Sequence, residues 1–460
     1  MSDLPTLPAH ILLQRLREGS LTSARLVEAV YDRIARLNPV HNAIVSLRPL
    51  AEVVEEARQA DAAPSAGPLH GLPFAIKDLS QTKGLRTTMG SPLFAEDIPT
   101  SDALHVARIR KAGAIIIGKT NTPEFGLGSH TYNTVFGATG NAFDSTRSAG
   151  GSSGGAAVAV ALGLVPMADG SDFGGSLRNP AGWNNIFGYR PSQGLVPAVP
   201  SADPFFGQLA TDGPMARNIR DLHLLLTVQA GYDPRAPLSL PDQDLSITPR
   251  DFAQCRVGWL GDLGGHLPFE DGILATCENA LATSRMEAVT PDTDFEELWQ
   301  AFVTLRHFNL SARLSPLHAD LAKRALLKPE ARWEVEGFLA LTANDILQAS
   351  MTRAKWYARI LSLFDRFDIL ALPSAQVHPF AIGHDWPKSI AGRRMDSYHR
   401  WMEVVAPATL SGCPVLNVPA GFVDGMPVGL QLIGRPRGDR ELLGFGLGYE
   451  ARLTAPTGIF

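Results

Sequence analysis

The sequence predicts an α/β fold in which helices cover both faces of a mixed, central β-sheet. Segments with apolar residues at helical spacing alternate with short apolar runs that are typical of buried strands. Of the 460 residues, 45% are hydrophobic and 19% are charged, which is the balance of a compact enzyme rather than of a disordered chain. Between about residues 290 and 365 the pattern changes to long helical stretches without strand signals.

The N-terminal part of the chain predicts two helices. In the first, apolar residues recur at helical spacing from position 26 to 37, Thr22 and Ser23 can cap the start, and Pro39 is expected to end the segment. The second is indicated by apolar residues at 53–60 and precedes a Pro/Gly/Ser-rich connection at 64–68.

Helices and strands then alternate along the rest of the chain. Helices are expected at about 102–112 and at 156–162. Short apolar runs predict buried strands at 74–76, 114–117, 165–168, 369–373, 415–419 and 428–433. The stretches at 295–310 and 340–364 predict a helical insertion, at about 290–365, over one side of the sheet. We expect residues 1–460 to form a single domain.

Composition and charge exclude several classes of protein. A net charge of -5 argues against a nucleic-acid surface. The three cysteines are far apart and form no Cys-x-x-Cys pair, so neither a zinc site nor a disulfide framework is indicated. The first residues do not resemble a signal peptide, and the apolar run at 156–168 is too short to span a bilayer. We expect a cytoplasmic protein with no cofactor, no metal and no membrane partner.

The stretch from Ser148 to Pro180 is the most informative part of the sequence. It reads Ser-Ala-Gly-Gly-Ser-Ser-Gly-Gly and then Gly-Ser-Asp-Phe-Gly-Gly-Ser-Leu-Arg-Asn-Pro, so that serines recur between glycines. Glycine lets backbone N–H groups approach a reacting atom, whereas serine becomes a nucleophile only when a base removes its proton. Lys77, in the apolar run Phe-Ala-Ile-Lys, is the candidate base. These residues predict a hydrolase that uses no metal.

Several long motifs, in order, resemble the amidase signature family. They are the glycine-serine motifs at 150–155 and 170–181, His-Gly-Leu-Pro ahead of Lys77-Asp78, Gly-Lys-Thr-Asn-x-Pro-Glu at 118–124, and Gly-Cys-Pro-x-Leu-Asn-Val-Pro-Ala at 412–420 followed by Pro-Val-Gly-Leu-Gln at 427–431. The resemblance covers nearly everything except about 205–365. It implies the amidase signature fold and the hydrolysis of a carboxylic acid amide to an acid plus ammonia or an amine.

The resemblance also implies a catalytic relay. Ser176 would be the nucleophile that carries an acyl intermediate, Ser152 the bridging serine, and Lys77 the base, in a variant of the serine triad. The family places the bridging serine after a cis peptide bond. Free lysine has a pKa of ~10.4, so a base that works around neutrality needs a much lower pKa, which burial can supply. Asp78 would oppose that change if its carboxylate faced the amine.

The family uses the segment that ends at the nucleophile as its oxyanion hole. The backbone N–H groups of Phe173, Gly174, Gly175 and Ser176 are therefore the expected donors, and losing one such donor typically costs about 2.7–4 kcal/mol of transition-state stabilisation. Phe173 replaces a residue that is often smaller, so its side chain could narrow or line the acyl pocket.

Three neighbouring side chains are candidates for supporting roles or for substrate contact. Ser153 is expected to be a supporting hydrogen-bonding residue. Asp172 and Arg178 flank the nucleophile and could contact substrate, but a structural ion pair or a backbone anchor fits them at least as well.

Other readings of the sequence stay open. Gly-x-Ser-x-Gly at 150–154 also matches the nucleophile elbow of α/β-hydrolases, but the residues before it are polar and turn-like rather than an apolar strand. The chain could instead be the amidase-like subunit of a tRNA-dependent amidotransferase, a glutaminase that makes ammonia from glutamine together with partner chains, or, third, a binding module without activity. No motif selects the amide substrate or the oligomeric state, and the family is compatible with a homodimer.

Overall fold

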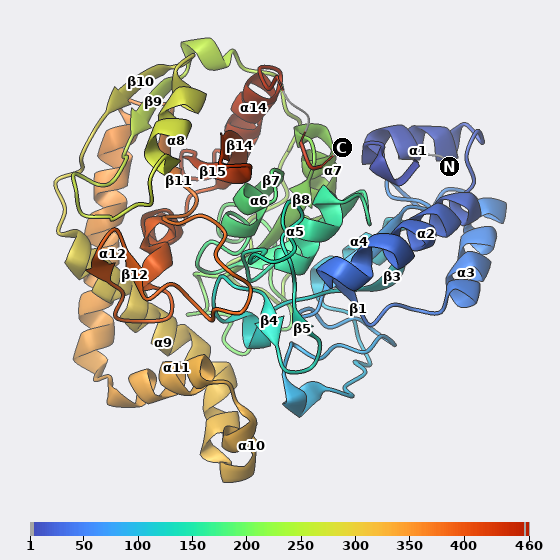
Figure 1. The fold of residues 1–460 in the computed structure, drawn as a ribbon, viewed down its shortest axis with the longest axis horizontal. Helices are drawn as coiled ribbons and strands as arrows, with labels where there is room; N and C mark the ends of the chain where they lie inside the picture. The colour runs from blue at the N-terminus through green and yellow to red at the C-terminus, as the bar shows by residue number, and fades with distance from the viewer. Residues whose placement is uncertain (1–3, 455–456, 460) are drawn as a thin grey trace.

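The computed structural model describes residues 4–454 and 457–459. The N-terminal helices α1 (Ala9–Arg17), α2 (Ser23–His41) and α3 (Leu50–Ala62) lie together at one end of the molecule (Figure 1). Thr22 caps α2 as expected, because its side chain accepts a hydrogen bond from the backbone N–H of Arg25. Pro39 does not end α2 but lies inside its last turn, and the helix continues to His41.

A small three-stranded sheet packs against these helices. Its strands are β1 (Ile44–Val45), β3 (Ile115–Thr120) and β2 (Pro73–Lys77), in that spatial order, with α4 (Leu104–Lys111) between β2 and β3 in sequence. β2 and β3 are parallel, as a helical crossover connection requires. β2 also contacts the edge of the main sheet, so its last residue, Lys77, lies between the two sheets.

The main sheet has eight strands and is mixed, which confirms the predicted fold class. β9 is parallel to β10 and to β11, and the other pairs are antiparallel. The spatial order is β10 (Arg285–Ala288), β9 (Arg256–Trp259), β11 (Ile369–Pro373), β15 (Met426–Ile433), β14 (Val415–Val423), β7 (Phe187–Arg190), β8 (Thr211–Ala216) and β6 (Met167–Asp172).

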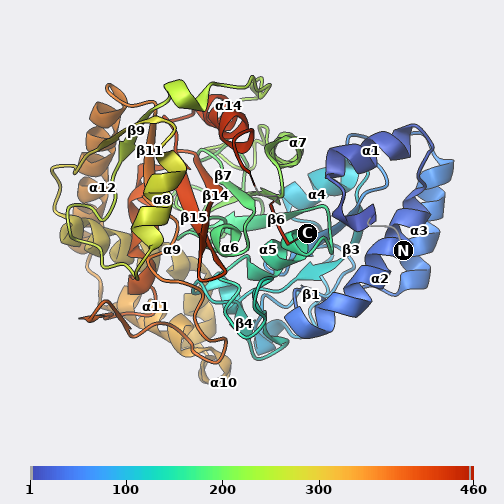
Figure 2. The same cartoon turned by 45° about the horizontal axis from the view of Figure 1, so that its top comes forward.

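Helices cover both faces of this sheet. Successive residues of a strand point to opposite faces, and here both faces carry apolar side chains that need to be covered. In β11, Ile369 and Ala371 belong to one apolar core, whereas Leu370 and Leu372 belong to the other. The first core also contains residues of α5 (Gly154–Ala161), α7 (Ile219–Gln229), α8 (Ile273–Leu281) and α14 (Asp439–Glu450). The second contains residues of α9 (Phe295–Ala319), α12 (Ala343–Phe364) and α13 (Ala406–Ser411). Figure 2 shows the sheet between these helices.

The helices predicted between 290 and 365 are present. They are α9, α10 (Leu321–Leu326), α11 (Pro329–Ala340) and α12, drawn in gold and orange in Figure 1. Asp294 caps α9, and Thr342 and Asp345 form a capping box at the start of α12. The assignment of residues 1–460 to one domain stays a prediction.

The remaining elements are short. They are α6 (Asn179–Trp183), the pair β4 (Tyr132–Asn133) and β5 (Gly137–Ala138), the pair β12 (Ser389–Ile390) and β13 (Arg393–Arg394), and 3-10 helices at Leu4–Thr6, Pro92–Phe94, Glu124–Gly126, Phe252–Gln254 and Arg400–Val405.

The cysteines lie inside the protein, and no described helix could cross a membrane. Cys255, Cys277 and Cys413 are all buried and free, and burial raises the pKa of each thiol, that of Cys413 to about 11. Within residues 4–454 and 457–459, every helix falls short of the length or the apolar character needed to cross a bilayer.

Candidate active site

Lys77 ends strand β2 and is completely buried. The preceding Phe74, Ala75 and Ile76 are also buried, so the strand carries the side chain into the interior as the sequence predicts. Its Nζ lies 2.8 Å from Ser152 Oγ, 2.8 Å from Ser153 Oγ and 3.0 Å from Ser171 Oγ. Three hydroxyl groups therefore surround one amine.

Ser152 and Ser153 lie in the loop that leads into α5. The peptide bond between Gly151 and Ser152 is cis, as the family resemblance implies. Ser153 precedes the first residue of α5, and its Oγ is also within 3.4 Å of the backbone N and O of Ser171. No strand precedes this loop directly, so the context of an α/β-hydrolase nucleophile elbow is missing.

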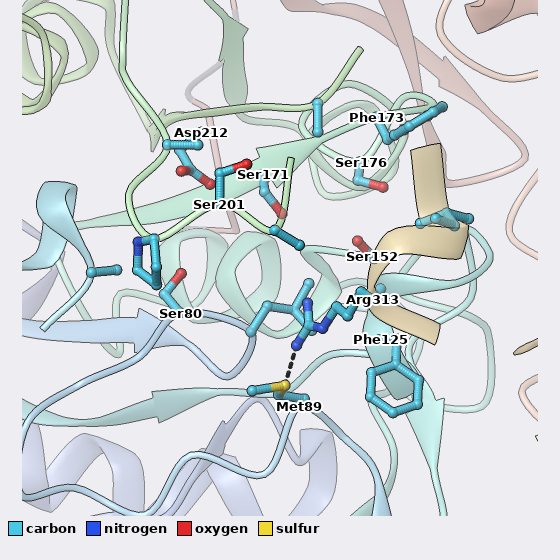
Figure 3. A pocket seen from close by; sticks show the side chains of 18 of the residues that line it. Ser80, Met89, Phe125, Ser152, Ser171, Phe173, Ser176, Ser201, Asp212 and Arg313 are labelled. Atoms are coloured by element: carbon cyan, nitrogen blue, oxygen red, sulfur yellow. Dashed lines mark hydrogen bonds between the residues drawn. The ribbon is translucent and has the colours of Figure 1, made fainter. Parts of the chain in front are cut away.

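Ser176 and Ser152 line the same cavity, which has a volume of about 530 Å³ (Figure 3). Ser176 follows the end of β6 by four residues and is 6% exposed, so its hydroxyl is accessible from the cavity. Phe173 lines the cavity too, as its place in the sequence predicts. Its ring lies edge-on against Phe302 of α9, with the ring centroids 6.0 Å apart.

The backbone between β6 and Ser176 forms a tight turn. Gly175 has a φ of +88°, and a Cβ atom at this position would lie 2.8 Å from Val405 Cγ1, so only glycine fits without a shift. The N–H of Gly175 donates to Asp172 Oδ1 at 3.0 Å. Among the described residues, the structure records no hydrogen-bond acceptor for the N–H groups of Phe173, Gly174 and Ser176. The predicted donor set is thus reduced by one, because Gly175 is engaged within the turn.

Asp172 and Arg178 form a buried structural ion pair and do not line the cavity. The Asp172 carboxylate accepts from Arg178 Nη2 at 2.9 Å and from the N–H of Leu177 at 3.0 Å, and it lies 3.2 Å from Arg190 Nη1. Although burial alone would raise the pKa of Asp172, the two guanidinium groups hold it well below its usual range. Asp172 and Arg178 are therefore anchors of the turn that presents Ser176, which is the second of the two readings that the sequence left open.

Burial lowers the pKa of Lys77 to about 7, and the nearby carboxylates of Asp169, Asp212 and Asp172 oppose this change. The Asp169 carboxylate accepts the backbone N–H of Lys77 at 2.9 Å, and it lies 3.3 Å from His105 Nε2. His105 Nδ1 is 3.4 Å from Asp212, so a chain of three titratable groups lies behind the lysine. The amine can consequently exist in its neutral form near neutral pH.

Asp78 does not counteract the change in Lys77. Its carboxylate accepts from the hydroxyl of Thr88 at 2.5 Å, and it stabilises the charged form of Lys119, a second buried lysine. Lys119 Nζ donates to the backbone oxygen of Ser80 at 2.6 Å. Lys77 and Asp78, although adjacent in the chain, therefore belong to different polar networks.

Among the described residues, no group of three or more His, Cys, Asp or Glu side chains could hold a metal ion.

Comparison with known proteins places the chain in a family. The family model described as Amidase matches residues 25–443. The chain belongs to the amidase family. An acylamidase from Rhodococcus erythropolis is 33% identical over 98% of this chain and 96% of its own length. One subunit of the glutamyl-tRNA(Gln) amidotransferase from Thermus thermophilus is 34% identical over 98% of this chain and 99% of its own.

A solved structure supports the same family assignment. The crystal structure of a bacterial aryl acylamidase, described as one of the amidase signature enzymes, aligns with a TM-score of 0.89 and 26% identity, over 98% of this chain and 97% of that one. The amidase signature fold is thereby confirmed. The protein is an amidase in the broad sense, an enzyme that hydrolyses amide bonds.

Sequence reasoning missed four residues of the candidate site. Ser171 lies inside the quoted motif but was given no role. Asp169 follows the apolar run at 165–168, but nothing in the sequence marks it as a neighbour of Lys77. His105 and Asp212 carry no local signal, because only the pairing of β6 with β8 and the packing of α4 bring them to Lys77.

Proposed function

We propose that the chain hydrolyses a carboxylic acid amide to the acid plus ammonia or an amine, through an acyl intermediate on Ser176 and a Lys77–Ser152–Ser176 relay. The observation that carries this proposal is the 2.8 Å distance between the buried Lys77 amine and Ser152 Oγ, beside a cavity that Ser152 and Ser176 share. The acylamidase and aryl acylamidase relatives support amides as the substrate class.

The contacts around Lys77 suit a neutral amine. Such an amine has two N–H groups and one lone pair. Ser153 and Ser171 can accept the two N–H groups, which leaves the lone pair for the hydroxyl proton of Ser152. Ser152 Oγ is then an acceptor for the proton of Ser176, so that the base acts on the nucleophile through one intervening hydroxyl.

The reaction proceeds in two steps. Ser176 Oγ attacks the amide carbon while its proton passes to Ser152 and the Ser152 proton passes to Lys77. The same path returns a proton to the nitrogen as the C–N bond breaks, so the leaving group departs as neutral ammonia or amine and an ester remains on Ser176. Water attacks this ester with the relay again as base, and the acid and free Ser176 are released. The N–H groups of Phe173, Gly174 and Ser176 would stabilise the negatively charged oxygen in both steps.

A serine-directed fluorophosphonate tests this proposal. The wild type should be labelled on Ser176, identified by peptide mass spectrometry, and Ser176→Ala should not react, whereas the exposed-serine control Ser65→Ala should react like the wild type. Lys77→Ala should fold, as judged by circular dichroism, and lose most activity at neutral pH. Labelling that survives Ser176→Ala would refute the nucleophile, and unfolding of Lys77→Ala would assign Lys77 a structural role.

The Thermus relative supports a second candidate, a glutaminase that works only with partner chains. The two candidates differ in what the isolated chain does. Release of acid and amine from simple amides by the purified chain supports the first. Release of ammonia from glutamine only after addition of the other amidotransferase chains would support the second.

A further inference from the structure

Four charged or titratable side chains line the cavity that contains Ser152 and Ser176. They are His105, Asp212, Arg306 and Arg313. His105 and Asp212 face each other at 3.4 Å. Arg306 is buried, and its Nε lies 2.7 Å from the carboxylate of Glu334, so its charge is compensated.

Arg313, on α9, is different. Its guanidinium lies over the ring of Phe125 at 5.5 Å from the centroid and contacts Met89 Sδ, the contact marked in Figure 3. A ring and a thioether carry no compensating negative charge. Within the part of the chain that the structure describes, Arg313 has no ion-pair partner and no carboxylate that raises its pKa, and the residue is exposed.

The surroundings of Arg313 are apolar. Leu310, one turn earlier on α9, and Leu127 line the same cavity, together with Met89 and Phe125. Asp212, the acidic residue of the cavity, lies apart from Arg313 on another side (Figure 3). An anion that reaches Arg313 therefore meets a fixed positive charge within apolar walls, and its other end can extend toward the serines.

We propose that Arg313 binds a carboxylate of the substrate, so that the preferred substrate is an amide that carries a carboxylate on an apolar spacer. A guanidinium offers paired N–H donors that match the two oxygens of a carboxylate. Arg313 is then a specificity-determining residue, and this inference rests on the proposed amide hydrolysis.

Two matched substrate pairs test this inference. In the first, glutaryl-4-nitroanilide is compared with 5-oxohexanoyl-4-nitroanilide, in which a methyl ketone replaces the carboxylate on the acyl side. In the second, N-butyryl-4-aminobenzoate is compared with N-butyryl-4-aminoacetophenone, which makes the same replacement on the amine side. The value of kcat/KM is measured for the wild type, for Arg313→Met, and for Arg324→Met, a control on α10 outside the cavity.

We expect the wild type to prefer the anionic member of at least one pair. Arg313→Met should lower the anionic-to-neutral ratio of kcat/KM by about 10- to 100-fold, the effect of one charge-assisted hydrogen-bonded contact, and Arg324→Met should keep the wild-type ratio. A wild-type ratio near one in both pairs, or a ratio that Arg313→Met leaves unchanged, would overturn the inference and indicate that Arg313 only stacks on Phe125.

Binding to Ser176→Ala separates this inference from the proposed function. The dissociation constants of the same four compounds are measured by calorimetry for Ser176→Ala and for Ser176→Ala with Arg313→Met. A preference for the anionic compound that disappears with Arg313→Met supports the carboxylate site even if no amide is hydrolysed, an outcome that would count against the proposed function alone. No preference in Ser176→Ala would overturn the site.

Discussion

At the scale of single residues, the chemistry of the site depends on how Lys77 is surrounded. Desolvation favours its neutral form, and Asp169, Asp212 and Asp172 favour its charged form. The first effect is larger, so the pKa of Lys77 falls to about 7 rather than staying near that of a free lysine. The residue is therefore poised to change protonation in the physiological pH range.

A pH profile tests this balance. If neutral Lys77 is the base, kcat/KM should rise with pH through an acid limb near pH 7. In Asp169→Asn the amide oxygen can still accept the Lys77 backbone N–H, but a carboxylate that favours the ammonium is lost, so the pKa of Lys77 falls further and the limb should move to lower pH. The profile is measured with a neutral anilide from pH 5 to 9.

The exposed carboxylate of Asp385, which lies 3.6 Å from Lys388, provides the control. Asp385→Asn should leave the limb in place. A limb that moves equally in both variants, or to higher pH in Asp169→Asn, would contradict the electrostatic account.

The sequence predicted Lys77, Ser152 and Ser176 because each lies in a motif, and the structure brings Lys77 to Ser152 as expected. It could not predict Asp169 and Asp212 as the carboxylates that act on the amine. Asp78, the nearest carboxylate in sequence, faces Thr88 and Lys119 instead, because successive residues at the end of a strand point in opposite directions.

At the scale of elements, the turn between β6 and Ser176 determines where the proposed oxyanion donors point. Asp172 holds the turn from inside through the N–H groups of Gly175 and Leu177. Val405 packs against the other side of the turn, where its side chain occupies the space that a Cβ atom on Gly175 would need. The backbone N–H groups are thus fixed by contacts on both sides, as preorganised electrostatic stabilisation requires.

Gly175→Ala tests the turn. The new methyl group would collide with Val405, so the turn must move, and we expect kcat/KM to fall by about 10- to 100-fold. Gly425→Ala is the matched control, since Gly425 also has a positive φ, +78°, but nothing lies within 4 Å of the place that a Cβ atom would take there. It should lose a little stability and no activity. Adding Val405→Ala to Gly175→Ala should recover part of kcat/KM, and equal losses in the two glycine variants would contradict this account.

Strands with strong apolar runs were predicted well, and strands without such runs were not. The expected strand at 369–373 coincides with β11, because all five of its residues are buried. All four residues of β10 are exposed, so β10 has no apolar pattern to detect, and β7, β8 and β9 were also missed. The prediction that Pro39 ends the helix was wrong. Proline removes only the hydrogen bond that its own N–H would donate to the residue four positions earlier, so two further residues can still follow it in the helix.

At the scale of the whole molecule, the fold class was predictable, but the separation of the three-stranded sheet from the main sheet was not. Alternating helices and apolar strands indicate a sheet between helical layers, but no local pattern tells which strands are neighbours. The gap between β2 and β6 is bridged by the carboxylate of Asp169, which accepts the Lys77 N–H. The candidate site thus lies where the three-stranded sheet meets the main sheet, and the Lys77 amine is buried there.

Burying the Lys77 amine should reduce stability at and below neutral pH. An unfolded lysine keeps its proton up to a pKa of ~10.4, whereas folded Lys77 loses it near 7. Between these values the unfolded chain binds more protons, so this group makes the folded state more stable as the pH rises from 7 to about 10, and its penalty is constant below 7.

Replacing the amine with an apolar group of similar size removes that penalty. Lys77→Met should raise the free energy of unfolding by about 2–4 kcal/mol at pH 6, after the lost hydrogen bonds are counted. The advantage should shrink toward pH 10. Urea unfolding of the wild type and of Lys77→Met at pH 6, 8 and 10 measures the difference in the free energy of unfolding. The contributions of the other titrating groups cancel in this difference. A difference that grows with pH would contradict the low pKa of Lys77.

The burial of Cys255, Cys277 and Cys413 has a practical consequence. A thiol reagent reaches these sulfurs only when the surrounding packing opens, so their alkylation reports the opening of the core rather than surface chemistry. A single cysteine introduced at an exposed position would therefore be modified first, and a fluorescent or spin probe could be attached there without removing any natural cysteine.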